Sequence, residues 1–295
     1  MNNNIEDKSE KPKLNKEKLF YIIGAIFLAL VAIVLIALIV FREKGIKEQL
    51  ENVEELKEIE AQEEVVETEI NNDEPEEDVE EEIQIVCDDL SEYDIPDLHL
   101  NFNSLYSANP NIFAWINIPG TKVDYPILQH PTDTAYYLNH NIDGSEGYPG
   151  CLYTEYYNST EMTSFNTIIY GHNMKDGSMF HTLHSYEKED FFKENPYIYI
   201  FTSKGTIVYK IFAATQYSDK HILFEYDFEK KEDRQKFIDT VKDWDNAVVD
   251  EDADVTADSK LITLSTCVSP SSSQRYIVVA YMVADGRPRE VKKEE

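Results

Sequence analysis

Cysteine is scarce in this sequence, and its scarcity argues against two kinds of site. Only Cys87, Cys151 and Cys267 occur among the 295 residues. No two of them have the close spacing of paired zinc ligands, and an odd, scattered set does not build a disulfide framework. A count this low is compatible with a single working thiol.

Basic residues are also few, which argues against a nucleic-acid partner. The chain has 27 Lys and Arg against 57 Asp and Glu, a formal net charge of −30. No basic patch with interleaved aromatic residues occurs. The acidic charge is concentrated in residues 48–94, which hold 22 acidic residues and one lysine. The remainder of the chain is only mildly acidic.

Charge is absent altogether from residues 19–41, a run of 23 residues. A helix of this length, at about 1.5 Å per residue, can cross a bilayer. The run is too long for a signal-peptide core, and Arg42, Glu43 and Lys44 follow it directly in place of a small-residue cleavage site. It predicts an uncleaved transmembrane helix, with a buried core helix as the alternative.

The flanking charges indicate the orientation of this helix. Five lysines precede it, and three basic residues lie close behind it, at 42, 44 and 47. The excess on the amino-terminal side favours a cytoplasmic tail over residues 1–18 and an extracellular remainder. We therefore predict a single-pass protein of the cell membrane.

Residues 42–94 predict an acidic spacer. Apolar residues recur every three or four positions between residues 45 and 70, as in an amphipathic helix or a short coiled coil. A dimerising stalk is one reading, but the like-charged flanks favour a solvated helical or disordered spacer. Residues 71–82, with Pro75 and eight acidic residues, are expected to be extended by self-repulsion.

From residue 95 the composition becomes aromatic and β-branched, and we expect a folded domain over residues 95–288, followed by a tail at 289–295. Eight short strands fit a mainly β fold, a closed barrel. The predicted strands are residues 113–118, 123–128, 150–153, 167–170, 197–202, 206–215, 260–266 and 275–284. Helices are predicted at residues 98–106, 180–192 and 229–244.

The last two predicted strands carry Cys267 and Arg275. The sequence Thr-Leu-Ser-Thr-Cys closes the first strand at residues 263–267, and Arg275 opens the second after a loop rich in serine. If the two strands are antiparallel neighbours, the thiol and the guanidinium share one rim of the sheet. A cation close to a thiol favours the nucleophilic thiolate.

His172 is the best candidate for the proton carrier among the seven histidines. It follows the strand-like residues 167–170 and precedes a loop signature, a place where a side chain is both fixed and exposed. Each residue alone has an ordinary reading: a buried small thiol, a loop imidazole and a solvated arginine at a strand start. The combination of the three favours a catalytic cleft.

Three blocks of this sequence resemble sortases, the membrane-anchored cysteine transpeptidases of Gram-positive bacteria. Residues 263–267 match the Thr-Leu-X-Thr-Cys signature of the family. Tyr-Gly-His-Asn-Met-Lys-Asp-Gly-Ser-Met-Phe at 170–180 and Trp-Ile-Asn-Ile-Pro-Gly-Thr-Lys-Val-Asp-Tyr-Pro at 115–126 are similar to class B sortases. The resemblance spans roughly residues 109–285. It implies a closed eight-stranded sortase-type barrel with peripheral helices, one of them between the sixth and seventh strands.

The resemblance implies cleavage of a C-terminal sorting signal after threonine and transfer of the protein to a peptidoglycan amine. Cys267 would form a thioacyl-enzyme, His172 would protonate the departing amine, and Arg275 would bind the oxyanion or the substrate backbone. The implied partners are secreted proteins that bear the signal, the cell-wall amine, and the membrane through residues 19–41. No cofactor is implied.

Asn139, Ser265 and Thr266 are candidate substrate contacts by resemblance, although all three equally fit ordinary strand and turn positions. Val268 stands where some class B members have an acidic residue, which leaves the substrate preference open. His181 and His184 have the spacing of a metal pair, but no third ligand is evident and we predict no metal.

Two other functions are alternatives to transpeptidation for the same domain. A hydrolytic cysteine peptidase with the same residues would cut a sorting peptide without transferring it to an added amine. A non-catalytic, tethered wall-binding or adhesive domain would not need Cys267 at all. Peptide turnover in the presence of an amine distinguishes all three.

Overall fold

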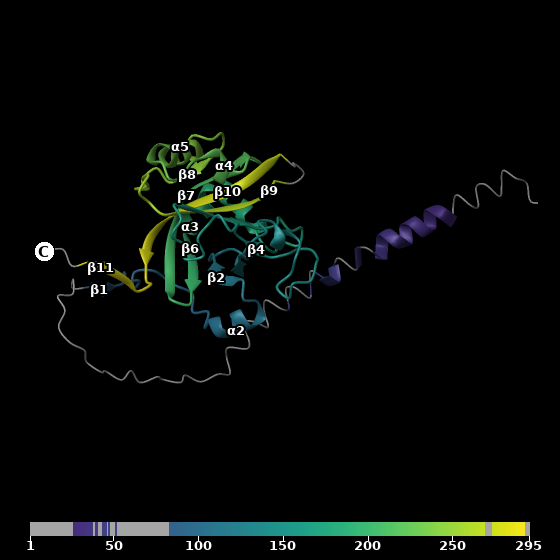
Figure 1. Ribbon diagram of the computed structural model, residues 1–295. Helices are drawn as coiled ribbons and strands as arrows, with labels where there is room; N and C mark the ends of the chain where they lie inside the picture. The colour runs from purple at the N-terminus through teal and green to yellow at the C-terminus, as the bar shows by residue number, and fades with distance from the viewer. Residues whose placement is uncertain are drawn as a thin grey trace, which may run out of the picture. The chain divides into compact units, whose positions relative to one another are not determined.

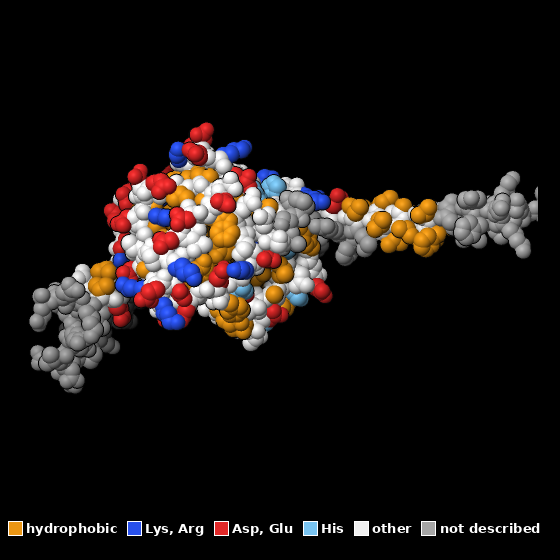
Figure 2. Space-filling model, turned by 90° about the horizontal axis from the view of Figure 1, so that it is seen from above, with side chains coloured by type: hydrophobic (Ala, Val, Ile, Leu, Met, Phe, Trp, Pro, Cys, Tyr) orange, Lys and Arg blue, Asp and Glu red, His pale blue; other side chains and the backbone are white. Residues whose placement is uncertain are grey.

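The structure is a computed structural model that describes residues 26–37, 39–40, 43–45, 47, 51, 83–268 and 273–292. The chain divides into two compact units, residues 1–47 and 48–295. In the first, residues 26–37 and 39–40 are helical, and their large apolar side chains are exposed (Figures 1 and 2). Within the described residues, no helix combines the length and the apolar character needed to cross a membrane.

Several predictions for the amino-terminal region fall on residues outside this description. The cytoplasmic tail at 1–18 lies wholly outside the described residues, as does most of the acidic spacer at 42–94. The transmembrane helix at 19–41 lies partly outside them. All three stay predictions.

Eight strands of the second unit close into a barrel, which confirms the predicted fold (Figure 1). The hydrogen-bonded order is β10-β9-β5-β4-β3-β2-β6-β7, and β7 also pairs with β10 to complete the ring. The short β8 extends the sheet beyond β7. The barrel strands are β2 (Ile112–Asn117), β3 (Asp124–Leu128), β4 (Leu152–Tyr153), β5 (Asn166–Tyr170), β6 (Tyr197–Thr202), β7 (Gly205–Ser218), β9 (Leu261–Cys267) and β10 (Gln274–Asp285), and β8 is Val248–Val249.

The pairing is mostly antiparallel, with two exceptions. β3 pairs with β4 and β5 pairs with β9 in parallel. The interior is filled by large side chains such as Trp115, which is fully buried and donates its indole N–H to Asp124 across the β2–β3 pair at 2.7 Å. A buried indole needs such a partner, and this one ties two barrel strands together.

Two of the predicted helices differ from the observed ones. The first was expected at 98–106, but α2 (Phe102–Ala108) begins later because the side chain of Asn101 caps it by accepting from the backbone N–H groups of Asn103 and Ser104. The continuous helix expected at 180–192 is wrong. The backbone turns extended at Lys188, so the segment forms a 3-10 helix, η3 (His181–Glu187), and then α3 (Glu189–Glu194).

The third predicted helix, expected at 229–244, is confirmed as α5 (Lys231–Lys242). Phe237, Ile238 and Val241 are buried on one face of α5 against the barrel residues Phe212 and Ile277. Burial of side chains of this size contributes about 1.5–3 kcal/mol each. The helix lies between the sixth and seventh barrel strands in chain order, as the resemblance implied, and Figure 1 shows it at one end of the barrel beside α4 (Ile222–Glu225) and β8.

A two-stranded ribbon lies outside the barrel and was not predicted. β1 (Ile83–Val86) pairs antiparallel with β11 (Arg289–Lys292). Beyond β1, Leu90, Tyr93 and Ile95 pack against a buried cluster on the barrel. The domain bounds at 95 and 288 stay a prediction. Residues before the first bound, such as Leu90 and Tyr93, also pack against the barrel.

Candidate active site

The strand register places the three predicted catalytic residues at one rim of the barrel. β5, β9 and β10 are consecutive neighbours. Arg275 on β10 is directly opposite Cys267 on β9, as the sequence predicted for antiparallel strands. On the other side, Tyr170 of β5 is aligned with Ser265 in the parallel pair, so His172 and Cys267 each lie two residues past an aligned position. Hydrogen-bond register, and not spacing along the chain, sets these positions.

Cys267 is the last residue of β9, and its side chain is exposed. A second thiol, Cys151, lines the same cleft but is only 4% exposed, and its Sγ–H donates to the carbonyl of His140 at 3.5 Å. Burial raises the pKa of Cys151 and keeps its thiol protonated. Of these two thiols, Cys267 is therefore the one that an external carbonyl group can reach.

His172 is half-buried, and its ring is held from two sides. Nε2 lies 2.8 Å from the carbonyl oxygen of Leu138, and the ring of Tyr148 packs against the imidazole with centroids 4.9 Å apart. A carbonyl oxygen only accepts, so Nε2 carries a proton in this contact. Gly171 allows this placement, because a Cβ there would lie 2.4 Å from the Leu152 side chain.

Arg275 is half-buried and donates to the backbone carbonyl of its neighbour Gln274 at 3.1 Å. The guanidinium, the thiol and the imidazole all line one cleft of about 270 Å³. The cleft is walled by the ends of β5, β9 and β10 and by the segment that follows β7. This arrangement puts a thiol, an imidazole and a guanidinium around one space, which are groups that acyl transfer through a thioester can use.

Sequence reasoning missed a contact between a buried carboxylate and an imidazole in this cleft. Glu155 is 7% exposed, and its carboxylate lies 2.8 Å from Nε2 of His221 and accepts from the hydroxyl of Tyr170 at 3.2 Å. Burial, and then the charge of Glu155, raise the pKa of Tyr170. No motif marks Glu155 or His221, which are 66 residues apart, so only the fold could reveal the pair.

The three candidate substrate contacts are placed differently. Ser265 and Thr266 line the cleft, although they are only 5% and 2% exposed. The Thr266 hydroxyl is buried without a hydrogen-bond partner among the described residues. Asn139 is exposed at the end of η2 (Tyr136–Leu138), and it is its neighbour Leu138 that lines the cleft.

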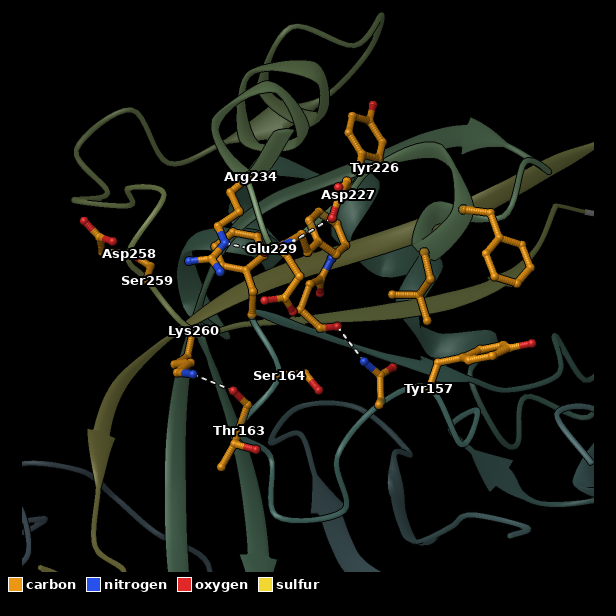
Figure 3. A pocket seen from close by; sticks show the side chains of 16 residues that line it. Tyr157, Thr163, Ser164, Tyr226, Asp227, Glu229, Arg234, Asp258, Ser259 and Lys260 are labelled. Carbon is orange, nitrogen blue, oxygen red and sulfur yellow. Dashed lines mark hydrogen bonds between the residues drawn. The ribbon is translucent and has the colours of Figure 1, made fainter. Parts of the chain in front are cut away.

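A second hollow, of about 680 Å³, lies between the α4–α5 segment and the start of β9, and no cysteine or histidine lines it (Figure 3). Its basic side chains are engaged locally. Arg234 donates to the carbonyl of Phe228 and lies over the ring of Phe165, and Lys260 donates to the carbonyl of Thr163 (Figure 3). This hollow has space but neither a thiol nor an imidazole in its lining, so we do not assign the chemistry to it.

Comparison with known proteins agrees with the geometry of the cleft. The family model of the sortase domain matches residues 116–283, more than half of the chain. Sortase B of Staphylococcus aureus is 32% identical over 184 residues, 62% of this chain and 74% of that protein. Sortase B of Listeria monocytogenes is 35% identical over 163 residues, 55% of this chain and 65% of that protein.

Solved structures give the same result. A S. aureus sortase B–substrate complex is 32% identical with a TM-score of 0.55, over 62% of this chain and 84% of that chain. The sortase B of B. anthracis in complex with AAEK1 is 26% identical with a TM-score of 0.60, over 81% of this chain and 97% of that chain. The resemblance to class B sortases found in the sequence is thereby confirmed, and the chain belongs to the sortase family of cysteine transpeptidases.

Proposed function

We propose that this protein cleaves a C-terminal sorting signal after threonine and joins the cleaved protein to an amine of the cell-wall peptidoglycan. The observation that carries the proposal is the register of β5, β9 and β10, which gathers His172, Cys267 and Arg275 around one cleft. Membership of the sortase family supports acyl transfer over simple hydrolysis.

In the first half-reaction, Sγ of Cys267 attacks the threonine carbonyl carbon of the signal. With Cys267 as the thiolate and His172 as the imidazolium, the C–N bond breaks, a thioester forms, and the departing amine takes the proton that the imidazolium gives up. Arg275 donates to the oxyanion or to the substrate backbone.

In the second half-reaction, the acceptor amine attacks the thioester carbonyl. The C–S bond breaks, the sulfur leaves as thiolate, and His172 accepts the proton from the incoming amine. Ser265 and Thr266 would contact the bound signal from the floor of the cleft, and Asn139 from its edge.

The location of the enzyme follows from the charge pattern of the chain. The uncharged run at 19–41 would anchor the protein in the cell membrane with residues 1–18 in the cytoplasm. The acidic spacer would hold the catalytic domain away from the membrane, on the extracellular side where secreted proteins and peptidoglycan are found.

The test uses the full-length protein, purified in detergent, with a library of candidate sorting peptides and amine acceptors, and reads products by mass. We expect a peptide–amine conjugate from the wild type and none from Cys267→Ala. Cleavage without conjugate, even at high amine concentration, would identify a hydrolase. Turnover that survives in Cys267→Ala would remove the proposed nucleophile.

A further inference from the structure

The side chain of Asn173, the residue after His172, connects three separate segments. Its Nδ2 donates to the backbone carbonyl of Cys267 at 2.9 Å and lies 3.1 Å from Nε2 of His184. Its Oδ1 lies 2.7 Å from Nδ1 of His181. One amide therefore joins the loop that carries His172, the end of β9 and the 3-10 helix η3.

The two N–H groups of Asn173 supply the carbonyl of Cys267 and Nε2 of His184 when His184 carries its proton on Nδ1. That Nδ1 lies 3.2 Å from a carboxylate oxygen of Glu187, which accepts the hydrogen bond. Nε2 of His184 also lies 3.2 Å from the carbonyl of Cys267, so His184 and Asn173 converge on the same backbone group. The ring of His184 is further held against Tyr276, with centroids 4.7 Å apart.

Asn173 is half-buried and is not among the residues that line the cleft. It is joined to His172 by a peptide bond and to the backbone carbonyl of Cys267 by a hydrogen bond. Its contacts therefore bear on the relative position of imidazole and thiol and not on the substrate.

We propose that Asn173 is a positioning residue that holds Cys267 in register with His172, and that His184 orients the Asn173 amide for this role. The expected effect on kcat rests on the proposed function, because it assumes the peptide–amine reaction. Displacing catalytic groups by about 1 Å can cost on the order of 100-fold in rate, whereas substrate binding is unaffected by a group that does not touch it.

The experiment compares Asn173→Ala and Asn173→Asp with the wild type in the peptide–amine assay. The aspartate keeps the shape of the side chain but has no N–H to donate to Cys267. We expect kcat to fall by about 10- to 100-fold in both variants, with KM within about twofold of the wild type. The matched control is Asn195→Ala, which loses a similar bond to the carbonyl of Phe191 at 3.0 Å, far from the cleft lining.

A second measurement separates positioning from a general loss of structure. The rate at which iodoacetamide alkylates Cys267 is followed by mass spectrometry in the wild type, Asn173→Ala, His172→Ala and the double variant. We expect Asn173→Ala to change the rate and its pH profile when His172 is present, and to change neither in the His172→Ala background. An equal change in both backgrounds overturns the proposal.

The proposal is also overturned if kcat stays within about twofold of the wild type, or if KM alone rises, since the latter marks a substrate contact. Failure of the proposed function looks different. In that case the wild type itself forms no peptide–amine conjugate, and the alkylation measurements still decide whether Asn173 couples the thiol to the imidazole.

Discussion

An arginine lies near each end of β10 (Gln274–Asp285), and the two arginines have different surroundings. Arg275, at the first end, lines the cleft opposite Cys267. Arg287, just past the second end, is 12% exposed and binds Asp285 with two N–H groups at 2.8 Å each. A third donor of Arg287 reaches the carbonyl of Glu161 at 2.8 Å. The guanidinium of Arg287 is fixed by a carboxylate and serves the fold, whereas that of Arg275 lies at the cleft where we propose the chemistry.

The largest expected effect is on stability at the second end. Arg287→Ala leaves the mostly buried carboxylate of Asp285 without its partner, which typically costs about 3–5 kcal/mol. We expect the free energy of unfolding in urea to fall by that order, with kcat of the remaining folded protein unchanged. A loss below about 1 kcal/mol would mean that the pair contributes no more than an exposed one.

The next effect is on catalysis at the first end. Arg275→Lys keeps the charge but loses the planar fork of donors, and we expect kcat/KM to fall by about 100- to 1,000-fold with little change in melting temperature. Peptide–amine kinetics and thermal melting measure the two quantities. Retention of activity by the lysine variant would show that only the positive charge matters.

Acid stability should depend on the second end of β10. Burial raises the pKa of Asp285, but the hydrogen bonds from Arg287 outweigh it and leave that pKa lowered, and a hydrogen bond from Arg289 lowers the pKa of Asp88. A lowered pKa adds stability that is present above the unfolded value of about 3.9 and is lost as the pH falls through the folded value.

We therefore expect the melting temperature to fall as the pH drops below about 4, and to fall less steeply in Asp285→Asn. Parallel acid profiles for the variant and the wild type would contradict this account. Arg275→Lys serves as the control, because it leaves the pair at the second end in place.

The sequence predicted well what depends on neighbouring residues. The strands rich in β-branched and aromatic residues were found, with β6 at its observed bounds, and the strand-end argument selected three residues that line one cleft. The register itself was only a condition in the prediction, and the structure supplied it.

Features that depend on distant contacts were not predicted. β1 lies within the acidic region, and its pairing with β11 joins positions some 200 residues apart, which no local pattern encodes. The Glu155–His221 pair and the bond from Asn173 to Cys267 span 66 and 94 residues. The break at Lys188 depends on one extended residue inside a helical pattern.

The smallest expected effect concerns Thr266, which precedes Cys267 on β9 and lies beside the first end of β10. Its hydroxyl is buried without a partner among the described residues, a situation that costs the free protein stability. Thr266→Val is therefore expected to leave the melting temperature unchanged or slightly higher. If the hydroxyl gains its partner when the sorting signal binds, KM rises by about three- to tenfold. A fall in melting temperature would reveal a partner in the free enzyme, and an unchanged KM would remove Thr266 from the substrate contacts.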